Sequence, residues 1–328
     1  MTAERQNPAE PHFDLTSLGE VMMRLSVGQG QRRIRAERLD AHLGGAECNV
    51  CAALAGLGRH TAWFGLLPES PLGEWALRHL RANGVDVGGV RLVPDSRLGT
   101  YFVELGVPPN PINVTYDRAR SAAADMKPAD IDWELLLDTR WLHLTGITPA
   151  LGHGPAATVD EALRQTADRG VRVSLDVNFR AKLWSPEDSR AWLEPRLDLV
   201  DLVICGVEDA KVVFGIDGVP EEVARMLAER TRGERAVVTL GEDGALAWDD
   251  GSLERAEGVS AQVVDRLGAG DAFAAGVIDG LLDGSLADGL RRGVAMGAAA
   301  LGQRGDVLNV SREVLGRLVV GGRARPER

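Results

Sequence analysis

Residues 265–276 read Asp265-Arg-Leu-Gly-Ala-Gly-Asp271-Ala-Phe-Ala-Ala-Gly276, a glycine-rich turn followed by an apolar helical pattern. Gly268 and Gly270 let the backbone approach a bulky anion closely, and the first amides of the predicted helix point into the same space. The helix dipole favours negative charge there. Asp271 stands where a carboxylate can take a proton from an alcohol that attacks a phosphate. The stretch therefore predicts phosphoryl transfer.

Apolar runs of strand length alternate with helical patterns along most of the chain. Strands are predicted at 14–18, 61–65, 141–144, 171–176, 202–204 and 236–240, and helices at 46–57, 72–83, 154–169, 186–197 and 220–232. This rhythm is typical of a mainly parallel sheet with helices on both faces. We therefore predict an α/β fold in a single domain over residues 13–320.

Two segments, 21–43 and 98–118, break this rhythm. They alternate polar and apolar residues without a long helix between them. A period of two indicates half-exposed antiparallel strands. We therefore predict a small β-sheet inserted into the larger α/β fold.

Composition excludes several classes of function. The chain has 48 acidic and 37 basic residues, a net charge of −11, which disfavours binding to nucleic acid or to an anionic membrane surface. It has no apolar run of about 18 residues that would predict a membrane span. Residues 1–12 are polar, contain two prolines and predict a disordered tail rather than a signal peptide. A cytoplasmic location is the expectation.

Other common sites match the sequence poorly. No lysine follows a glycine, so the chain has no P-loop. A dinucleotide-binding fingerprint would need a glycine in place of Phe273. Cys48 and Cys51 have C-x-x-C spacing, but no second pair completes a zinc site, and their segment predicts a buried helix. The three cysteines indicate no disulfide framework.

Three stretches carry a family resemblance: Gly44-Gly45-Ala-Glu-Cys-Asn49, Asp176-Val-Asn-Phe-Arg180-Ala-Lys-Leu-Trp184 and Gly268–Asp271. Together they make the sequence resemble the ribokinase-like (PfkB) carbohydrate kinases, and among these the 2-keto-3-deoxygluconate kinases. The resemblance implies a three-layer sandwich whose inserted sheet forms a lid over the sugar and a contact between two copies of the chain. It implies ATP and Mg²⁺ and, as in many relatives, a monovalent cation such as K⁺ near Asp265.

The resemblance and the phosphoryl-transfer chemistry give the glycine-rich turn its expected roles. Gly268, Ala269 and Gly270 would hold the transferring phosphate, and Asp271 would orient the sugar hydroxyl and accept its proton. The helix dipole is expected to lower the pKa of Asp271 and keep it ionised at neutral pH. The alternative is a structural cap at the beginning of a helix.

By resemblance, the loop that contains Thr239, Gly241 and Gly244 contacts nucleotide phosphate. A β-hairpin turn would also require these glycines, and both roles are compatible. Small and apolar residues at 294–298, beginning with Val294, are expected to line an adenine pocket. Ordinary helix packing is the alternative there.

The segment expected to bind Mg²⁺ departs from the family pattern. The family carries Asn-x-x-Glu after the strand at 202–204, whereas this chain has Gly206-Val-Glu208-Asp209. Gly206 supplies no side chain. Asp209 is expected to order water around Mg²⁺, which commonly keeps several waters, and Glu208 is expected to be a solvated helix residue.

The sugar site is predicted from both motif and resemblance. Gly44 and Gly45 permit close approach to hydroxyls, and Asn49 can donate and accept hydrogen bonds. Arg180 follows a strand at the edge where parallel sheets bind ligands. The remaining positions match substrate contacts of the 2-keto-3-deoxygluconate kinases: Tyr101, Tyr116, Arg118 and Asp306. The alternatives are a surface ion pair for Arg180, a lid arginine that serves only solubility for Arg118, and helix capping for Asn49.

Arg118 bears on the substrate, because an arginine fork suits the carboxylate of a sugar acid and a neutral sugar does not need one. The leading hypothesis is an ATP-dependent kinase that phosphorylates the terminal hydroxyl of 2-dehydro-3-deoxy-D-gluconate. The alternatives are a fructokinase- or ribokinase-type enzyme acting on a neutral sugar, a non-catalytic relative that binds sugar or nucleotide, and a dinucleotide-dependent oxidoreductase.

Overall fold

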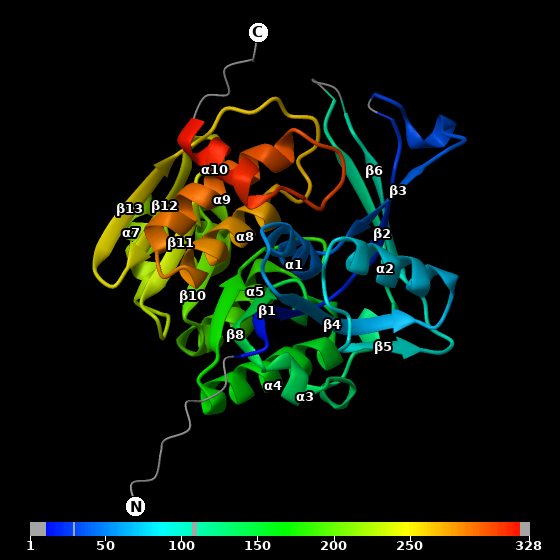
Figure 1. Ribbon diagram of the computed structural model, residues 1–328, viewed down its shortest axis with the longest axis horizontal. Helices are drawn as coiled ribbons and strands as arrows, with labels where there is room; N and C mark the ends of the chain where they lie inside the picture. Colours follow the sequence, from blue (N-terminus) through cyan, green and yellow to red (C-terminus); the bar gives the residue numbers. More distant parts are fainter. Residues whose placement is uncertain (1–10, 29, 107–109, 322–328) are drawn as a thin grey trace, which may run out of the picture.

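The computed structural model describes residues 11–28, 30–106 and 110–321, which form a large sheet between two helical layers with a smaller sheet beside them (Figure 1). The order of the nine central strands is β13-β12-β11-β10-β9-β8-β1-β4-β5. The strands from β11 to β5 in this order are parallel, and β12 and β13 are antiparallel additions. Their bounds are β1 (Phe13–Leu18), β4 (Thr61–Pro68), β5 (Val90–Val93), β8 (Thr139–Thr145), β9 (Arg172–Asp176), β10 (Leu202–Gly206), β11 (Arg235–Thr239), β12 (Gly244–Asp249) and β13 (Ser252–Glu257).

The helices divide between the two faces of this sheet, which bury separate apolar clusters. One face carries α1 (Ala46–Gly56), α2 (Pro71–Ala82), α8 (Ala269–Leu282), α9 (Leu286–Leu301) and α10 (Arg312–Gly321). The other carries α3 (Trp133–Leu136), α4 (His153–Arg169), α5 (Pro186–Leu193), α6 (Val207–Phe214) and α7 (Pro220–Ala228).

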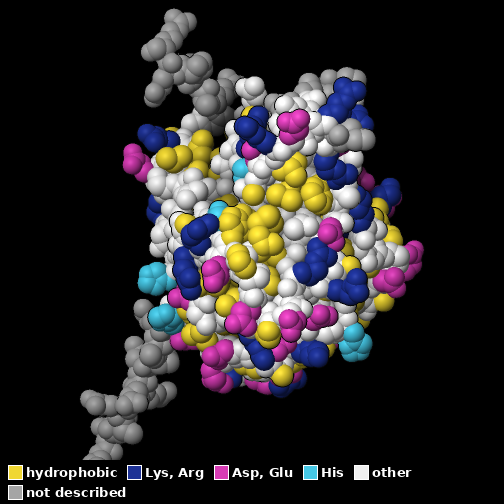
Figure 2. All heavy atoms as spheres, turned by 90° about the vertical axis from the view of Figure 1, so that its right-hand side faces the viewer, with side chains coloured by type: hydrophobic (Ala, Val, Ile, Leu, Met, Phe, Trp, Pro, Cys, Tyr) yellow, Lys and Arg dark blue, Asp and Glu magenta, His cyan; other side chains and the backbone are white. Residues whose placement is uncertain are grey.

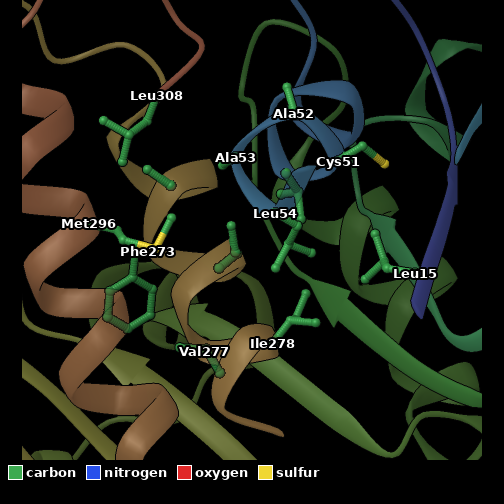
Figure 3. Close-up of a cluster of buried hydrophobic side chains, with 14 of the residues drawn as sticks. Leu15, Cys51, Ala52, Ala53, Leu54, Phe273, Val277, Ile278, Met296 and Leu308 are labelled. Atoms are coloured by element: carbon green, nitrogen blue, oxygen red, sulfur yellow. The ribbon is translucent and has the colours of Figure 1, made fainter. Parts of the chain in front are cut away.

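Side chains alternate between these clusters along a strand. In β10, Leu202 and Ile204 join the first cluster, and Val203 and Cys205 join the second, as a period of two requires. In the first cluster, Phe273 and Ile278 of α8 lie between α9 and α1 (Figure 3). This packing fixes the beginning of α8 above the sheet.

The smaller sheet, called the lid below, consists of β3 (Asp40–Gly44), β2 (Met22–Ser26), β6 (Gly99–Glu104) and β7 (Asn113–Asp117) in that order. The prediction of a small inserted sheet is confirmed. The prediction that its strands are all antiparallel is wrong, because β2 and β6 pair in parallel. They follow β1 and β5, which are parallel strands of the central sheet, and so leave it in the same direction.

The predicted strands and helices are present, but two helices end earlier than predicted. Helix α5 ends at Leu193 because Pro195 cannot continue an α-helix, and the chain proceeds as a 3₁₀ turn over Glu194–Leu199. Helix α7 ends at Ala228, whose carbonyl accepts a 2.9 Å hydrogen bond from the hydroxyl of Thr231. Of the tail predicted at 1–12, residues 1–10 lie outside those described.

The carboxyl ends of the parallel strands meet at one edge of the central sheet, and the predicted site residues come from the segments that follow them. Asp176 ends β9, Gly206 ends β10, Thr239 ends β11, and Gly19 and Glu20 follow β1. No helix within the described ranges is long and apolar enough to cross a membrane.

Candidate active site

Helix α8 begins at the glycine-rich turn. Gly268 caps it with a φ of 82°, a left-handed conformation that favours glycine. A Cβ atom there would lie 1.9 Å from the carbonyl oxygen of Asp306, so no side chain fits. The amides of Ala269, Gly270 and Asp271 are in the first turn, where a helix offers no carbonyl of its own to accept them. This is the arrangement that an anion-binding turn needs.

Asp271 is the third residue of α8, and only 8% of it is exposed. Its Oδ2 accepts a 2.7 Å hydrogen bond from Nδ2 of Asn49 in α1. Burial raises the pKa of Asp271 to about 6, although the Asn49 hydrogen bond and the charge of Arg180 act to lower it. The expectation that the helix dipole lowers this pKa is therefore wrong, because desolvation outweighs the dipole at a buried position.

Arg180 lies among three carboxyl groups at this edge of the sheet. Its charge lowers the pKa values of Asp271, Asp176 and Asp209. Burial nevertheless raises the pKa of Asp176 to about 7, and repulsion by Asp271 adds to this rise. Arg180 itself is exposed, so its guanidinium is accessible to an anion.

Lys182 connects the Arg180 segment to the lid, a role that no sequence pattern predicts. Its Nζ donates a 2.7 Å hydrogen bond to the carbonyl of Val114 in β7. It also lies 5.8 Å from the centre of the Tyr116 ring, within the range of a cation–π contact. The lid is thereby held against the segment that follows β9.

The loop with Thr239, Gly241 and Gly244 is a hairpin turn between β11 and β12, which confirms the structural alternative. Its predicted nucleotide contact stays a prediction. Thr239 pairs in register with Gly206 of β10. A Cβ atom at Gly206 would lie 3.7 Å from Oγ1 of Thr239 and 3.8 Å from Oδ2 of Asp209. The position therefore has room for a side chain.

Asp209, the predicted metal residue, lies in the first turn of α6. Burial raises its pKa, and the charge of Arg180 opposes that rise. Among the residues that the structure describes, no three His, Cys, Asp or Glu side chains form a metal-binding group. A kinase magnesium ion needs only one or two carboxylates because it also binds waters and substrate phosphates, so Asp209 fits that use.

Three of the predicted sugar residues, Gly44, Tyr101 and Tyr116, belong to the lid strands β3, β6 and β7. The hydroxyl of Tyr101 donates a hydrogen bond to Oδ2 of Asp306. A Cβ atom at Gly44 would lie 2.1 Å from that hydroxyl, so glycine is required for this close approach. The rings of Tyr101 and Tyr116 are 5.7 Å apart. Gly45 caps α1, which carries Asn49.

Arg118 is paired within the protein, which the sequence did not predict. Its Nη2 forms an ion pair with Oε2 of Glu20, and Oε1 of Glu20 accepts a 3.0 Å hydrogen bond from Ser121. The Arg118 guanidinium also lies 5.4 Å from the centre of the Tyr116 ring. Its Nε is buried and has no hydrogen-bond partner among the described residues. The side chain is therefore held in place with donor capacity left over.

Val294 is a buried residue of α9 and belongs to the core. Gly297 and Ala298, in the same predicted adenine stretch, are half-buried. A Cβ atom at Gly297 would lie 3.3 Å from the carbonyl of Ala269. The surface next to the glycine-rich turn is therefore provided by the second half of the predicted stretch.

Glu47 is a buried acid inside the Gly44–Asn49 motif, and no local pattern in the sequence predicts its burial. Its Oε1 accepts hydrogen bonds of 2.7 and 2.6 Å from the hydroxyls of Thr145 and Thr148. Burial raises its pKa to about 7. These contacts tie the beginning of α1, and therefore Asn49, to the carboxyl end of β8.

A surface cavity of about 630 Å³ lies at the other edge of the sheet, between the amino ends of β1 and β4 and the end of α2. Its lining includes His12, Arg59, His60 and Arg81. Arg59 is already paired with Asp279 and Asp283. None of the predicted site residues lines this cavity.

Comparison with known proteins agrees with this geometry. Residues 13–312 match the family model described as pfkB family carbohydrate kinase. The chain is 36% identical to 2-dehydro-3-deoxygalactonokinase of Haloferax volcanii, over 96% of this chain and 99% of that protein. It is 31% identical to 2-dehydro-3-deoxygluconokinase of Thermoproteus tenax, over 93% of each. The crystal structure of 2-dehydro-3-deoxygluconokinase from Thermotoga maritima superposes with a TM-score of 0.87 at 34% identity, covering 94% of this chain and 99% of that one.

Proposed function

Because the chain belongs to the PfkB family of carbohydrate kinases, we propose that it transfers the γ-phosphate of ATP to the terminal hydroxyl of 2-dehydro-3-deoxy-D-gluconate. The observation that carries the proposal is Asp271, a buried carboxyl group in the first turn of α8, beside the first amides of that helix. Relatives that act on 2-dehydro-3-deoxy sugar acids, at 31% and 36% identity, support the substrate class.

In the proposed reaction, the oxygen of the sugar hydroxyl forms a bond to the γ-phosphorus and the bond from that phosphorus to ADP breaks. Asp271 accepts the proton of the hydroxyl, with Asn49 fixing its orientation. The amides of Ala269, Gly270 and Asp271 stabilise the charge on the transferring group. Arg180 adds an exposed positive charge beside them.

Asp271 must be ionised to accept a proton, so kcat/KM should rise with pH through about 6, the pKa of its buried carboxyl. Below that value the rate should fall about tenfold per pH unit. Asn49→Ala removes a hydrogen bond that favours the ionised form, so its midpoint should move upward. The pH profiles of the two proteins test this. A midpoint unchanged by Asn49→Ala would assign the titration to the nucleotide instead.

Arg118 is proposed to bind the carboxylate of the sugar acid through donors that Glu20 leaves free. Arg118→Ala should lower kcat/KM for the sugar acid by about 100-fold and change kcat/KM for fructose or ribose little. Arg97→Ala is the matched control, because Arg97 lies in the loop that leads into β6 and makes an exposed pair with Asp117 of the lid. Equal losses for acid and neutral sugars would contradict the carboxylate assignment.

The galacto epimer of the same sugar acid is a second candidate substrate, since the Haloferax volcanii relative is named for it. Purified protein should be assayed with ATP and both epimers, fructose and ribose. We expect the gluconate form to give the highest kcat/KM. Preference for the galactonate form would change the substrate within the class. Preference for a neutral sugar would refute the sugar-acid proposal.

Mg²⁺ is proposed to bind near Asp209 through water and the ATP phosphates, where it would neutralise phosphate charge. Gly206→Asn would restore the side chain that the family pattern has. Because Gly206 has a φ of −71° and its Cβ position would make only ordinary van der Waals contacts, at 3.7 Å and beyond, the variant should fold normally. We expect it to lower the Mg²⁺ concentration for half-maximal activity by about threefold to tenfold. A Mg²⁺ titration at saturating ATP tests this. An unchanged Mg²⁺ concentration for half-maximal activity would show that position 206 does not contribute to Mg²⁺ binding.

We also propose that two copies of the chain associate through the lid. Figure 2 views the side on which the lid lies, where apolar side chains gather within a ring of charged ones. The face of the lid opposite Arg24 and Tyr101 includes half-buried Leu25 and Phe102, with Arg33 5.3 Å from the Phe102 ring. Analytical ultracentrifugation of the wild type and of Phe102→Glu tests this. A wild-type monomer at micromolar concentration would refute it.

A further inference from the structure

Arg24 is a buried arginine in the lid strand β2, and nothing in the proposed chemistry uses it. Only 1% of its side chain is exposed. Its Nη2 lies 2.5 Å from Oδ2 of Asp265, and its Nη1 lies 2.5 Å from Oδ1 of Asp306. One guanidinium therefore bridges two carboxylates that are 41 positions apart along the chain, each on a different segment.

Both carboxylates belong to segments that build the anion-binding turn. Asp265 precedes the turn, and its Oδ1 accepts a 3.1 Å hydrogen bond from the amide of Leu267. The carbonyl of Asp306 lies against Gly268, within 1.9 Å of where a Cβ atom would be. Two negative charges beneath the turn would oppose the binding of phosphate unless a cation balanced them.

The surroundings agree with a permanent positive charge at this place. Burial disfavours the charged guanidinium, but Asp306 and Asp265 outweigh it and raise the pKa of Arg24. His42, on the neighbouring strand β3, has its pKa lowered by burial and by Arg24 and therefore adds no second charge. The Tyr101 hydroxyl donates to the other oxygen of Asp306.

A monovalent cation near Asp265, expected from the family resemblance, does not fit these contacts. The two oxygens of Asp265 already accept from the Leu267 amide, the Arg24 guanidinium and, at 3.4 Å, the Gly305 amide. Oδ2 accepts from both Arg24 and Gly305, so a potassium ion bound to this oxygen would have to displace a fully buried guanidinium. We propose that Arg24 is a built-in counter-cation of the anion-binding turn, so that phosphoryl transfer is independent of monovalent cations and the lid is coupled to the turn.

Arg24 would act as a positioning residue, through the turn rather than on the substrate. The inference rests on the proposed function only because the test measures phosphoryl transfer. For the wild type at constant ionic strength, exchanging K⁺ for Na⁺ or tetramethylammonium should leave kcat/KM unchanged. Arg24→Ala should lower kcat/KM by about 100-fold. Added millimolar guanidinium should restore about tenfold of this loss in a saturable way, a response that a merely misfolded protein would not give.

Arg59→Ala is the matched control, because Arg59 also bridges two aspartates, Asp279 and Asp283, but far from the turn. Guanidinium should not raise its activity. Arg24→Lys keeps the charge but cannot bridge both carboxylates. It replaces the alanine variant in the test if that variant does not fold. Its kcat should fall about tenfold and stay independent of K⁺.

Three results would overturn the proposal: stimulation of the wild type by K⁺ of about tenfold or more, normal activity of Arg24→Ala, or equal rescue of Arg59→Ala by guanidinium. The measurements use whichever sugar the panel shows to be phosphorylated, so an incorrect substrate does not affect them. If no sugar reacts, the Kd of a non-hydrolysable ATP analogue is measured instead. It should be insensitive to K⁺ in the wild type and weakened in Arg24→Ala, and K⁺-dependent binding by the wild type would refute the proposal.

Discussion

Asp271→Asn should lower kcat by about 10³-fold while ATP binding and the fold are retained. An amide has nearly the same shape as the carboxyl group, and its Oδ1 can accept the hydrogen bond that Asn49 donates over 2.7 Å. It cannot take the proton of the sugar hydroxyl. Steady-state kinetics with the preferred sugar give kcat, and calorimetric titration with an ATP analogue gives the binding constant.

Asp288→Asn provides the control for this variant. Asp288 is the third residue of α9, just as Asp271 is the third residue of α8, but it is paired with Arg291 at the surface. Its replacement should leave kcat unchanged. If Asp271→Asn kept kcat within about tenfold of the wild type, Asp271 would not be the base. Absence of turnover in both the wild type and Asp271→Asn, across the whole sugar panel, would favour a protein that binds without catalysis.

Gly268→Ala should have the second large effect, because it acts on the fold and the site together. A side chain at φ 82° is strained, and its Cβ would overlap the carbonyl of Asp306. We expect a loss of about 2–4 kcal/mol in unfolding free energy and a fall of at least about 100-fold in kcat/KM for ATP. Urea unfolding and steady-state kinetics measure the two effects.

Gly270→Ala separates the two contributions. An ideal Cβ at Gly270 meets no atom of the described residues within 4 Å beyond its own turn of the helix, so this variant should be as stable as the wild type. If the nucleotide phosphate occupies that space, the KM for ATP should rise by about tenfold or more. A normal KM would mean that phosphate does not approach α8 at this residue, which would contradict the anion-binding role.

Local patterns explain why much of the fold and the centre of the site could be predicted. Six of the nine central strands (β1, β4, β8, β9, β10 and β11) are short apolar runs, and this pattern was sufficient to predict them. The edge strands β5, β12 and β13 lack so clear a run and were not among the predicted strands. Asp271, Gly268 and Gly270 stand within four positions, so their joint role is visible without knowing the fold. Asn49 was predicted to lie at the sugar end, and it contacts Asp271 across 222 positions of the chain.

Other features depend on contacts that no local pattern records. Arg24 occurs in a short alternating strand and meets Asp265 across 241 positions, so the sequence presents it as an ordinary lid arginine. Glu20 pairs with Arg118 in the same long-range way. The direction of the Asp271 pKa shift was predicted wrongly because the helix dipole is a local property, whereas burial is a property of the whole fold.

The burial of Asp271 also affects the heat resistance of the whole protein. Its pKa is 3.8 in the unfolded chain and about 6 in the folded one, so the folded state binds this proton more tightly. Stability is therefore greatest at low pH for this group and declines as pH rises from about 4 to 6. At neutral pH the ionised carboxylate weakens the fold by ~3 kcal/mol. Asparagine carries no such charge, so the inactive Asp271→Asn enzyme should melt at a higher temperature than the active one at pH 7, and the difference should shrink in acid.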